Sequence, residues 1–121
     1  MSSPLVLAPE PEEGNVEYKR QLICSSERLN KLVSQLKFRL AEGGGEAVYY
    51  LGVEDDGRAC GLLSDELRES LETFKIMAQR LKVETVKKEF RPGLRNNSQT
   101  VKIVVRNKHK QPLEVRGVVL G

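Results

Sequence analysis

The sequence GGGEAVYYLGVEDDGRACGLL, residues 43–63, predicts the centre of the fold. Residues 47–53 are rich in apolar and aromatic side chains, which is typical of a strand. The Asp-Asp-Gly that follows at 55–57 predicts a tight turn, because Gly adopts positive φ without strain and Asp tolerates the left-handed region. Residues 58–63 then return as a second strand. We therefore expect a β-hairpin in the middle of a sheet.

A helical pattern of apolar residues lies on each side of this hairpin. Between residues 27 and 42 the apolar side chains recur three or four positions apart and form one stripe, and residues 65–81 repeat the pattern. Ser25 and Ser64 each precede a helix and are predicted N-caps, whereas the glycines at 43–45 end the first helix, the first of them in the left-handed conformation.

Shorter alternating patterns predict the remaining strands, at residues 15–24, 82–91, 100–106 and 113–120. The order of elements is then β-α-β-β-α-β-β-β. Two helices on one mixed or antiparallel sheet make an α+β fold, a two-layer sandwich.

The ends of the chain differ from its middle. Residues 1–14 combine three prolines with three glutamates, which predicts a disordered lead-in with little to bury. Residues 15–112 form the α+β domain. No apolar run approaches the ~18 residues that cross a bilayer, and the N-terminus lacks the pattern of a secretory signal. We expect a monomeric, cytoplasmic protein that does not contact membranes.

Cys24 and Cys60 lie in apolar, strand-like settings without metal-ligand spacing. Such cysteines are expected to be a reduced, buried pair in a cytosolic protein.

The residues do not indicate an enzyme. Ser25, Ser64 and His109 match no nucleophile–base–acid pattern, and Gly-x-Ser-x-Gly is absent. The glycines at 43–45 lack the Lys-Ser/Thr of a phosphate loop. Adjacent acids at 54–56 suit a turn better than a calcium loop, whose ligands are regularly spaced, and a single histidine makes no zinc site. We predict no catalytic residue, no metal and no cofactor.

Charge divides the chain into an acidic and a basic part. The formal net charge is +3, but residues 1–74 hold 8 Lys/Arg against 14 Asp/Glu, whereas residues 75–121 hold 12 against 3. Such a basic part suits the phosphates of RNA, and it equally suits strand edges that solvated lysines keep from pairing. Phe90 is the only aromatic residue among these cations, so any RNA contact is expected at the backbone. The candidate nucleic-acid-binding residues are Lys87, Lys88, Arg91, Arg95, Lys102, Arg106, Lys108 and Lys110.

Four short blocks carry a family resemblance: GNVEYK at 14–19, GEAVY at 45–49, GVEDDG at 52–57 and GL at 61–62. In combination they resemble the N-terminal domain of the eukaryotic GTP-binding proteins one and two, which are translational-type GTPases related to elongation factor Tu. The resemblance implies a non-catalytic accessory or adaptor domain, or a fragment, of such a protein, which positions the GTPase on a ribosome, an RNA or a protein partner.

The tail LEVRGVVLG, residues 113–121, resembles the first strand of that family's GTPase domain. Gly121 corresponds to the first glycine of its phosphate loop, and the Lys-Ser/Thr of that loop is absent from this chain. The resemblance therefore implies that GTP and magnesium are bound only by a longer family member.

A looser resemblance joins the block at 17–20, EYKR, and the glycine-rich stretch after the first helix to the divergent AlbA/Schlafen-type domain. It implies a nucleic-acid-binding module as the alternative function, with Glu17 and Lys19 as residues to mutate. A third class, a protein-interaction domain without affinity for nucleic acid, predicts no RNA binding even at low salt.

Overall fold

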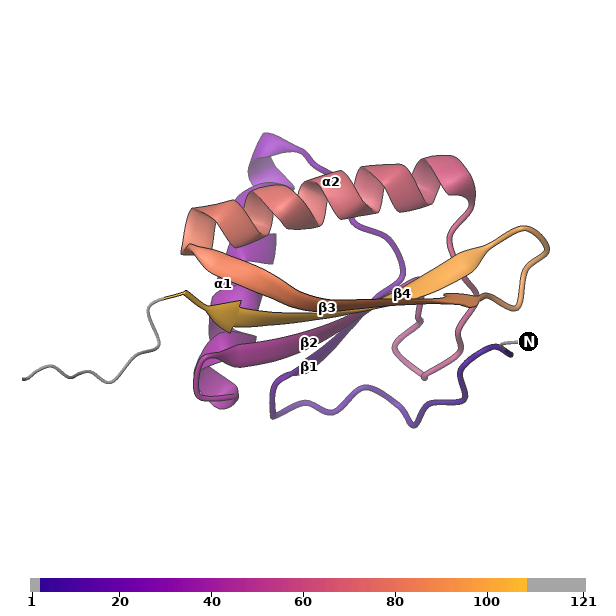
Figure 1. The fold of residues 1–121 in the computed structure, drawn as a ribbon, viewed down its shortest axis with the longest axis horizontal. Helices are drawn as coiled ribbons and strands as arrows, with labels where there is room; N and C mark the ends of the chain where they lie inside the picture. Colours follow the sequence, from indigo (N-terminus) through magenta and orange to yellow (C-terminus); the bar gives the residue numbers. More distant parts are fainter. Residues whose placement is uncertain (1–2, 109–121) are drawn as a thin grey trace, which may run out of the picture.

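The computed structural model describes residues 3–108, which form a mixed four-stranded sheet with two helices on one face (Figure 1). The predicted α+β class is confirmed. Within the described residues the order is β-α-β-α-β-β, and the strand predicted at 113–120 lies outside them. The elements are β1 (Val16–Lys19), α1 (Ser26–Glu42), β2 (Glu46–Leu51), α2 (Ser64–Leu81), β3 (Val83–Pro92) and β4 (Gln99–Asn107).

The strands lie in the order β1-β2-β4-β3, with β1 parallel to β2 and with β4 antiparallel to both of its neighbours. β2 is inside the sheet, as predicted, but the expected hairpin is wrong. Residues 52–63 form a loop instead of a second strand, and its β-type pairing is limited to isolated bridges of Arg58 with Val6 and of Leu62 with Gln99. Gly52, Gly57 and Gly61 have φ of 87°, 94° and 91°, which a strand does not allow. β4 takes the place beside β2 that the second hairpin strand was expected to fill.

The helix ends follow the sequence closely. Ser25 caps α1, since its Oγ accepts a hydrogen bond from the backbone N–H of Arg28 at 3.3 Å. α2 begins one residue earlier than predicted, and its N-cap is Leu63 rather than Ser64. The left-handed glycine after α1 is Gly44, with φ 64°, and not the first glycine of the run, whose φ is −102°.

The main core lies between the helices and the sheet. The leucine stripe of α1 and one face of α2 pack against alternate residues of the two inner strands. This packing fixes which face of each strand is buried. Its most enclosed members include Leu36, Tyr49, Met77, Val101, Ile103 and Val105.

The N-terminal segment, residues 3–14, crosses the other face of the sheet (Figure 1). Leu5 and Leu7 pack against a small cluster built around the buried Tyr18. The Tyr18 hydroxyl donates a hydrogen bond to the Ala8 carbonyl at 2.8 Å. The composition predicts a lead-in with little to bury, whereas these leucines cover part of the sheet.

The cysteines are not the buried pair that the sequence predicts. Cys24 is exposed and Cys60 is half-buried. The Cys60 Sγ lies 3.4 Å from the Gly52 carbonyl oxygen and 3.5 Å from a carboxylate oxygen of Glu54. Burial, followed by the hydrogen bond to Glu54, raises the pKa of the Cys60 thiol. None of the helices in residues 3–108 has the length and apolar character needed to cross a membrane.

Candidate binding surfaces

The seven predicted basic residues that the structure describes do not form one patch. Lys102 and Arg106 alternate along β4 with Val101, Ile103 and Val105 of the main core, so they lie on the face opposite the helices. On β3, cross-strand partners share a face: Lys87 is opposite Val104 and Arg91 opposite Thr100, whereas Lys88 is opposite Ile103.

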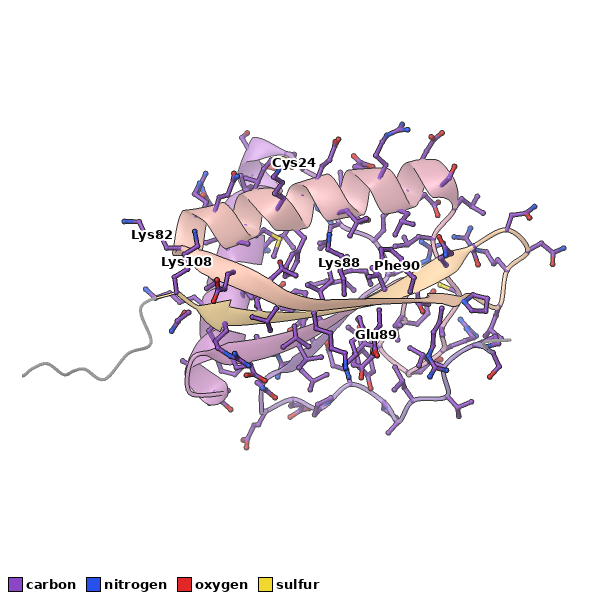
Figure 2. All side chains as sticks on the ribbon, viewed as in Figure 1. Cys24, Lys82, Lys88, Glu89, Phe90 and Lys108 are labelled. Atoms are coloured by element: carbon purple, nitrogen blue, oxygen red, sulfur yellow. The ribbon has the colours of Figure 1, made fainter. Side chains whose placement is uncertain are left out.

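The helix side and the face opposite the helices therefore receive different cations. Figure 2 shows Lys88 and Phe90 on the side of the sheet that carries α2, and Glu89 on the other side. Lys110 lies outside the described residues.

On the face opposite the helices, the cations are already engaged. Arg106 contacts the Glu46 carboxylate at 3.1 Å, and Lys87 contacts that of Glu89 at 3.4 Å. Lys102 lies 5.9 Å from the ring centre of a tyrosine on β2. Arg91 donates a hydrogen bond to a backbone carbonyl of the N-terminal segment at 3.3 Å. This face is a mixture of charges with the N-terminal segment across it.

Arg95 serves the structure of the β3–β4 loop. Its Nη2 donates hydrogen bonds to the Gly61 carbonyl at 2.6 Å and to the Glu66 carboxylate at 2.7 Å. Glu66 also accepts a hydrogen bond from the Leu63 N–H at the start of α2, at 2.9 Å. These contacts lower the pKa of the Glu66 carboxyl, the bond from Leu63 contributing most. Arg95 therefore ties the loop to the helix instead of facing a ligand.

Glu17 and Lys19, singled out by the looser resemblance, are also ion-paired. Glu17 is buried and accepts a hydrogen bond from Nε of Arg39 at 2.8 Å, while Lys19 lies 3.6 Å from its other oxygen. Sequence reasoning missed Arg39, which lies beside the leucine stripe of α1 and is itself buried. Its position three residues after Leu36 was the signal that it faces inward. Among residues 3–108, no group of three or more His, Cys, Asp or Glu side chains is placed to hold a metal ion.

A groove of about 330 Å³ lies between α2 and β3. Its floor is apolar and includes Leu71, Phe74 and Ala78 from the helix. The sequence did not predict this groove, because its shape depends on how α2 packs across β3, which the apolar pattern of each element does not determine. The lining residues are Leu71, Glu72, Phe74, Lys75, Ala78, Gln79, Val83, Thr85, Lys88, Ile103 and Lys108.

The lysines around this groove, termed the α2–β3 groove, are not paired with acidic side chains of the described residues. Lys75, Lys88 and Lys108 are exposed and make no ion pair with another described residue. Glu72 is the single acid of the lining. The groove is therefore an apolar depression with a net positive rim.

The outer edge of β3 runs beside the groove. β3 has ten residues and, in the described part of the chain, pairs only with β4. From Glu84 to Arg91 every residue is exposed. A backbone edge of this kind carries N–H and C=O groups that no neighbouring strand has taken.

The described residues form a small α+β domain that carries an apolar groove and an unpaired strand edge on its surface. The comparisons with known proteins agree with the resemblance drawn from the sequence. An 81-residue region, 66% of the chain, is 49% identical to GTP-binding protein 2 of Homo sapiens, and the same figures hold for GTP-binding protein 2 of Mus musculus. The similar region belongs to the N-terminal part of those proteins.

The chain spans 14% of the length of these relatives. A further relative, uncharacterized protein R625 of Acanthamoeba polyphaga mimivirus, is 33% identical over 67 residues, which are 54% of this chain and 36% of that protein. No family profile and no solved structure matches the chain. The comparisons thus give the AlbA/Schlafen resemblance no support.

Proposed function

We propose that this chain is a non-catalytic accessory domain that positions a translational-type GTP-binding unit on its partner. The observation that carries the proposal is the 49% identity of 81 residues to part of GTP-binding protein 2. A region shared at that level, yet amounting to 14% of the relatives, suits a module that serves a larger protein.

Two described side chains of the kinds that catalysis uses, a buried carboxylate and a thiol, are not in reactive settings. The one buried carboxylate of residues 3–108, that of Glu17, is ion-paired with Arg39 at 2.8 Å. The half-buried thiol of Cys60 has a raised pKa, which disfavours the reactive thiolate. The exposed surfaces, by contrast, offer an apolar groove and a strand edge, which are features of recognition.

The test uses human GTP-binding protein 2 with its matching region deleted or replaced by the same region of this chain. We expect the deletion to keep GTP binding and to lose association with whichever proteins or ribosomes are found to co-purify with the intact protein. The replacement is expected to restore that association. Loss of GTP binding on deletion, or association that survives it, would contradict the proposal.

Nucleic-acid binding is the alternative, favoured by the cations of β3 and β4. Arg91 and Lys102 line a small pocket with Thr100, whose buried hydroxyl has no hydrogen-bond partner among the described residues. A phosphate in this pocket would lie next to the two cations. Glu89, which lines the same pocket, weakens the case because it repels anions.

A further inference from the structure

We propose that the outer edge of β3 and the α2–β3 groove bind an extended, acidic peptide of a protein partner, which adds to the sheet as a strand next to β3. The inference rests on the proposed function and names the kind of partner that the domain recognises. Such binding needs a free strand edge, a groove for the peptide's side chains, and charges that favour an acidic peptide. The described residues supply each of these.

The edge is suitable because β3 is long and its pairing is regular from Lys87 to Pro92, a stretch in which Lys88 lines the groove. The register with β4 shifts once, between Thr85 and Lys87, and then runs without interruption to Pro92. Because β3 pairs with β4 along one edge, its other edge is a continuous row of backbone groups from the bulge to Pro92. An extended peptide gains main-chain hydrogen bonds at such an edge.

The groove is suitable because of where the side chains of an added strand must point. Successive residues of a strand face opposite sides of the sheet. Every second residue of a peptide paired with β3 lies on the α2 side, next to Lys88 and Phe90, which Figure 2 shows there. The apolar floor around Leu71 and Ala78 is then open to the peptide's apolar residues. Phe90, exposed by 44%, adds apolar surface along the same side.

The rim decides the charge of the occupant. Three lysines without an ion pair in the described residues surround the groove, against the single acid Glu72. A peptide with carboxylates flanking its apolar residues is complementary to that rim, and a basic peptide is repelled.

The same charges argue against the two other occupants. A second copy that pairs antiparallel through its own β3, centred on Lys87 and Lys88, brings these lysines of both chains close to one another, which opposes association in that register. A nucleic acid has phosphates for the lysines but leaves the apolar floor without contact. Sequence-tolerant binding of single strands depends on several exposed aromatic residues, and β3 offers only Phe90.

The experiment selects a random seven-residue peptide library, displayed on phage, against the full chain. We expect enriched peptides to carry net negative charge and to alternate apolar residues. No enrichment over an empty support, or enrichment of basic peptides, would overturn the proposal.

One enriched peptide is then synthesised with a fluorescent label, and its affinity is measured by anisotropy. The Lys88→Glu variant is expected to bind at least about tenfold more weakly, a difference of about 1.4 kcal/mol. The matched control is Lys31→Glu on the exposed side of α1, which makes the same charge change away from the groove and is expected to bind within about twofold of the parent chain. Equal loss in both variants would show a general charge effect and overturn the site.

Strand addition itself is tested by N-methylating alternate backbone nitrogens of the peptide, which removes hydrogen-bond donors and keeps every side chain. We expect at least about tenfold weaker binding for the methylation pattern that blocks the β3-facing nitrogens. Unchanged affinity for both patterns would overturn it. If the peptide fails while the deletion of the whole region still abolishes partner association, only this inference is wrong and the proposed function stands.

Discussion

Arg39 shows how one residue joins three parts of this molecule. Its Nε binds Glu17 of β1 at 2.8 Å, Nη1 binds the Gly14 carbonyl at 2.8 Å, and Nη2 binds the Pro11 carbonyl at 3.1 Å. Its side chain is only 5% exposed. A guanidinium in such a place needs both a countercharge and acceptors for its other N–H groups. Arg39 has them, and so it fastens the N-terminal segment and β1 to α1.

Replacing Glu17 by Gln is expected to lower the free energy of unfolding by about 3–5 kcal/mol, because the buried charge of Arg39 loses its countercharge. Urea denaturation measures the change. The control is Lys19→Gln, which removes the longer, 3.6 Å contact to the same carboxylate. The Lys19 side chain is 22% exposed, so we expect Lys19→Gln to lower the free energy of unfolding by less than about 1 kcal/mol. Equal effects of the two changes would show that burial of the pair is not what matters.

The carboxyl of Glu66 gives a pH dependence. Hydrogen bonds from the Leu63 N–H and from Arg95 lower its pKa below the ordinary value of 4.5. A group whose folded-state pKa is lowered adds stability above its unfolded-state pKa, and this contribution is lost as the pH falls through the folded-state pKa. Glu66→Gln is therefore expected to cost about 1 kcal/mol at neutral pH.

Urea unfolding at several pH values measures this contribution. The difference between Glu66→Gln and the parent chain should shrink as the pH falls below 4.5. Glu72→Gln, a change of the same kind on an exposed part of α2, should leave the urea midpoint unchanged at neutral pH. A difference between Glu66→Gln and the parent that grows in acid would contradict the assignment.

At the scale of elements, the position of the N-terminal segment depends on Gly57. Gly57 has φ 94°, and a Cβ on it would collide with the carbonyl oxygen of Leu7 and lie 2.6 Å from that of Ala8. Gly44 also has positive φ, 64°, but a Cβ there would meet nothing within 4 Å. The two positions share backbone strain, and only Gly57 adds a collision with the segment.

Gly57→Ala is thus expected to release residues 3–14 from the sheet, whereas Gly44→Ala costs only the strain of a left-handed residue, about 1–2 kcal/mol. Hydrogen exchange of the Tyr18 amide reports release directly, since that N–H donates to Glu10 at 2.6 Å. Exchange should accelerate by at least about tenfold in Gly57→Ala beyond the change in Gly44→Ala. Equal acceleration in the two variants would show that the segment is not held at Gly57.

The elements also show what the sequence can and cannot predict. Both helices follow from their apolar stripes, because the stripe is a local property of 17 and 18 residues. The hairpin prediction failed because the partner of β2 is chosen by the whole fold. The residues at 99–107 supply a run of β-branched side chains for that place, whereas residues 58–63 contain a glycine with positive φ. The local sequence pattern does not show which of these two segments pairs with β2.

Sites made of distant residues were the least predictable. Glu17 and Arg39 are 22 positions apart, and the α2–β3 groove combines residues 71–108. The basic candidates were predicted as residue types, but their division between two faces depends on the register of β3 with β4. One bulge after Thr85 decides which lysine reaches the helix side.

At the scale of the whole molecule, the charge asymmetry of the sequence becomes two separate surfaces. Four of the eight candidate cations lie on the face opposite the helices, and two of these, Lys87 and Arg106, are ion-paired there. Lys75, Lys88 and Lys108, which make no ion pair with a described residue, lie around the α2–β3 groove instead. The molecule therefore lacks a continuous basic track within residues 3–108, and this limits how it meets RNA.

Binding of a labelled oligouridine, measured by anisotropy across a salt series, tests that limit. On the face opposite the helices, Arg91 and Lys102 are the candidate cations that make no ion pair with another described residue. Each phosphate neutralised on a single strand contributes about −0.7 to the slope of log affinity against log salt, so two contribute about −1.4. We expect a slope no steeper than this, and we expect Phe90→Ala to change the affinity little, because contacts to the RNA backbone need no stacking.

A slope steeper than about −3, or a tenfold loss of affinity in Phe90→Ala, would mean that cations from both faces and an aromatic residue act together. That result would favour nucleic acid over a protein partner, since it requires the groove lysines to take part in the same contact.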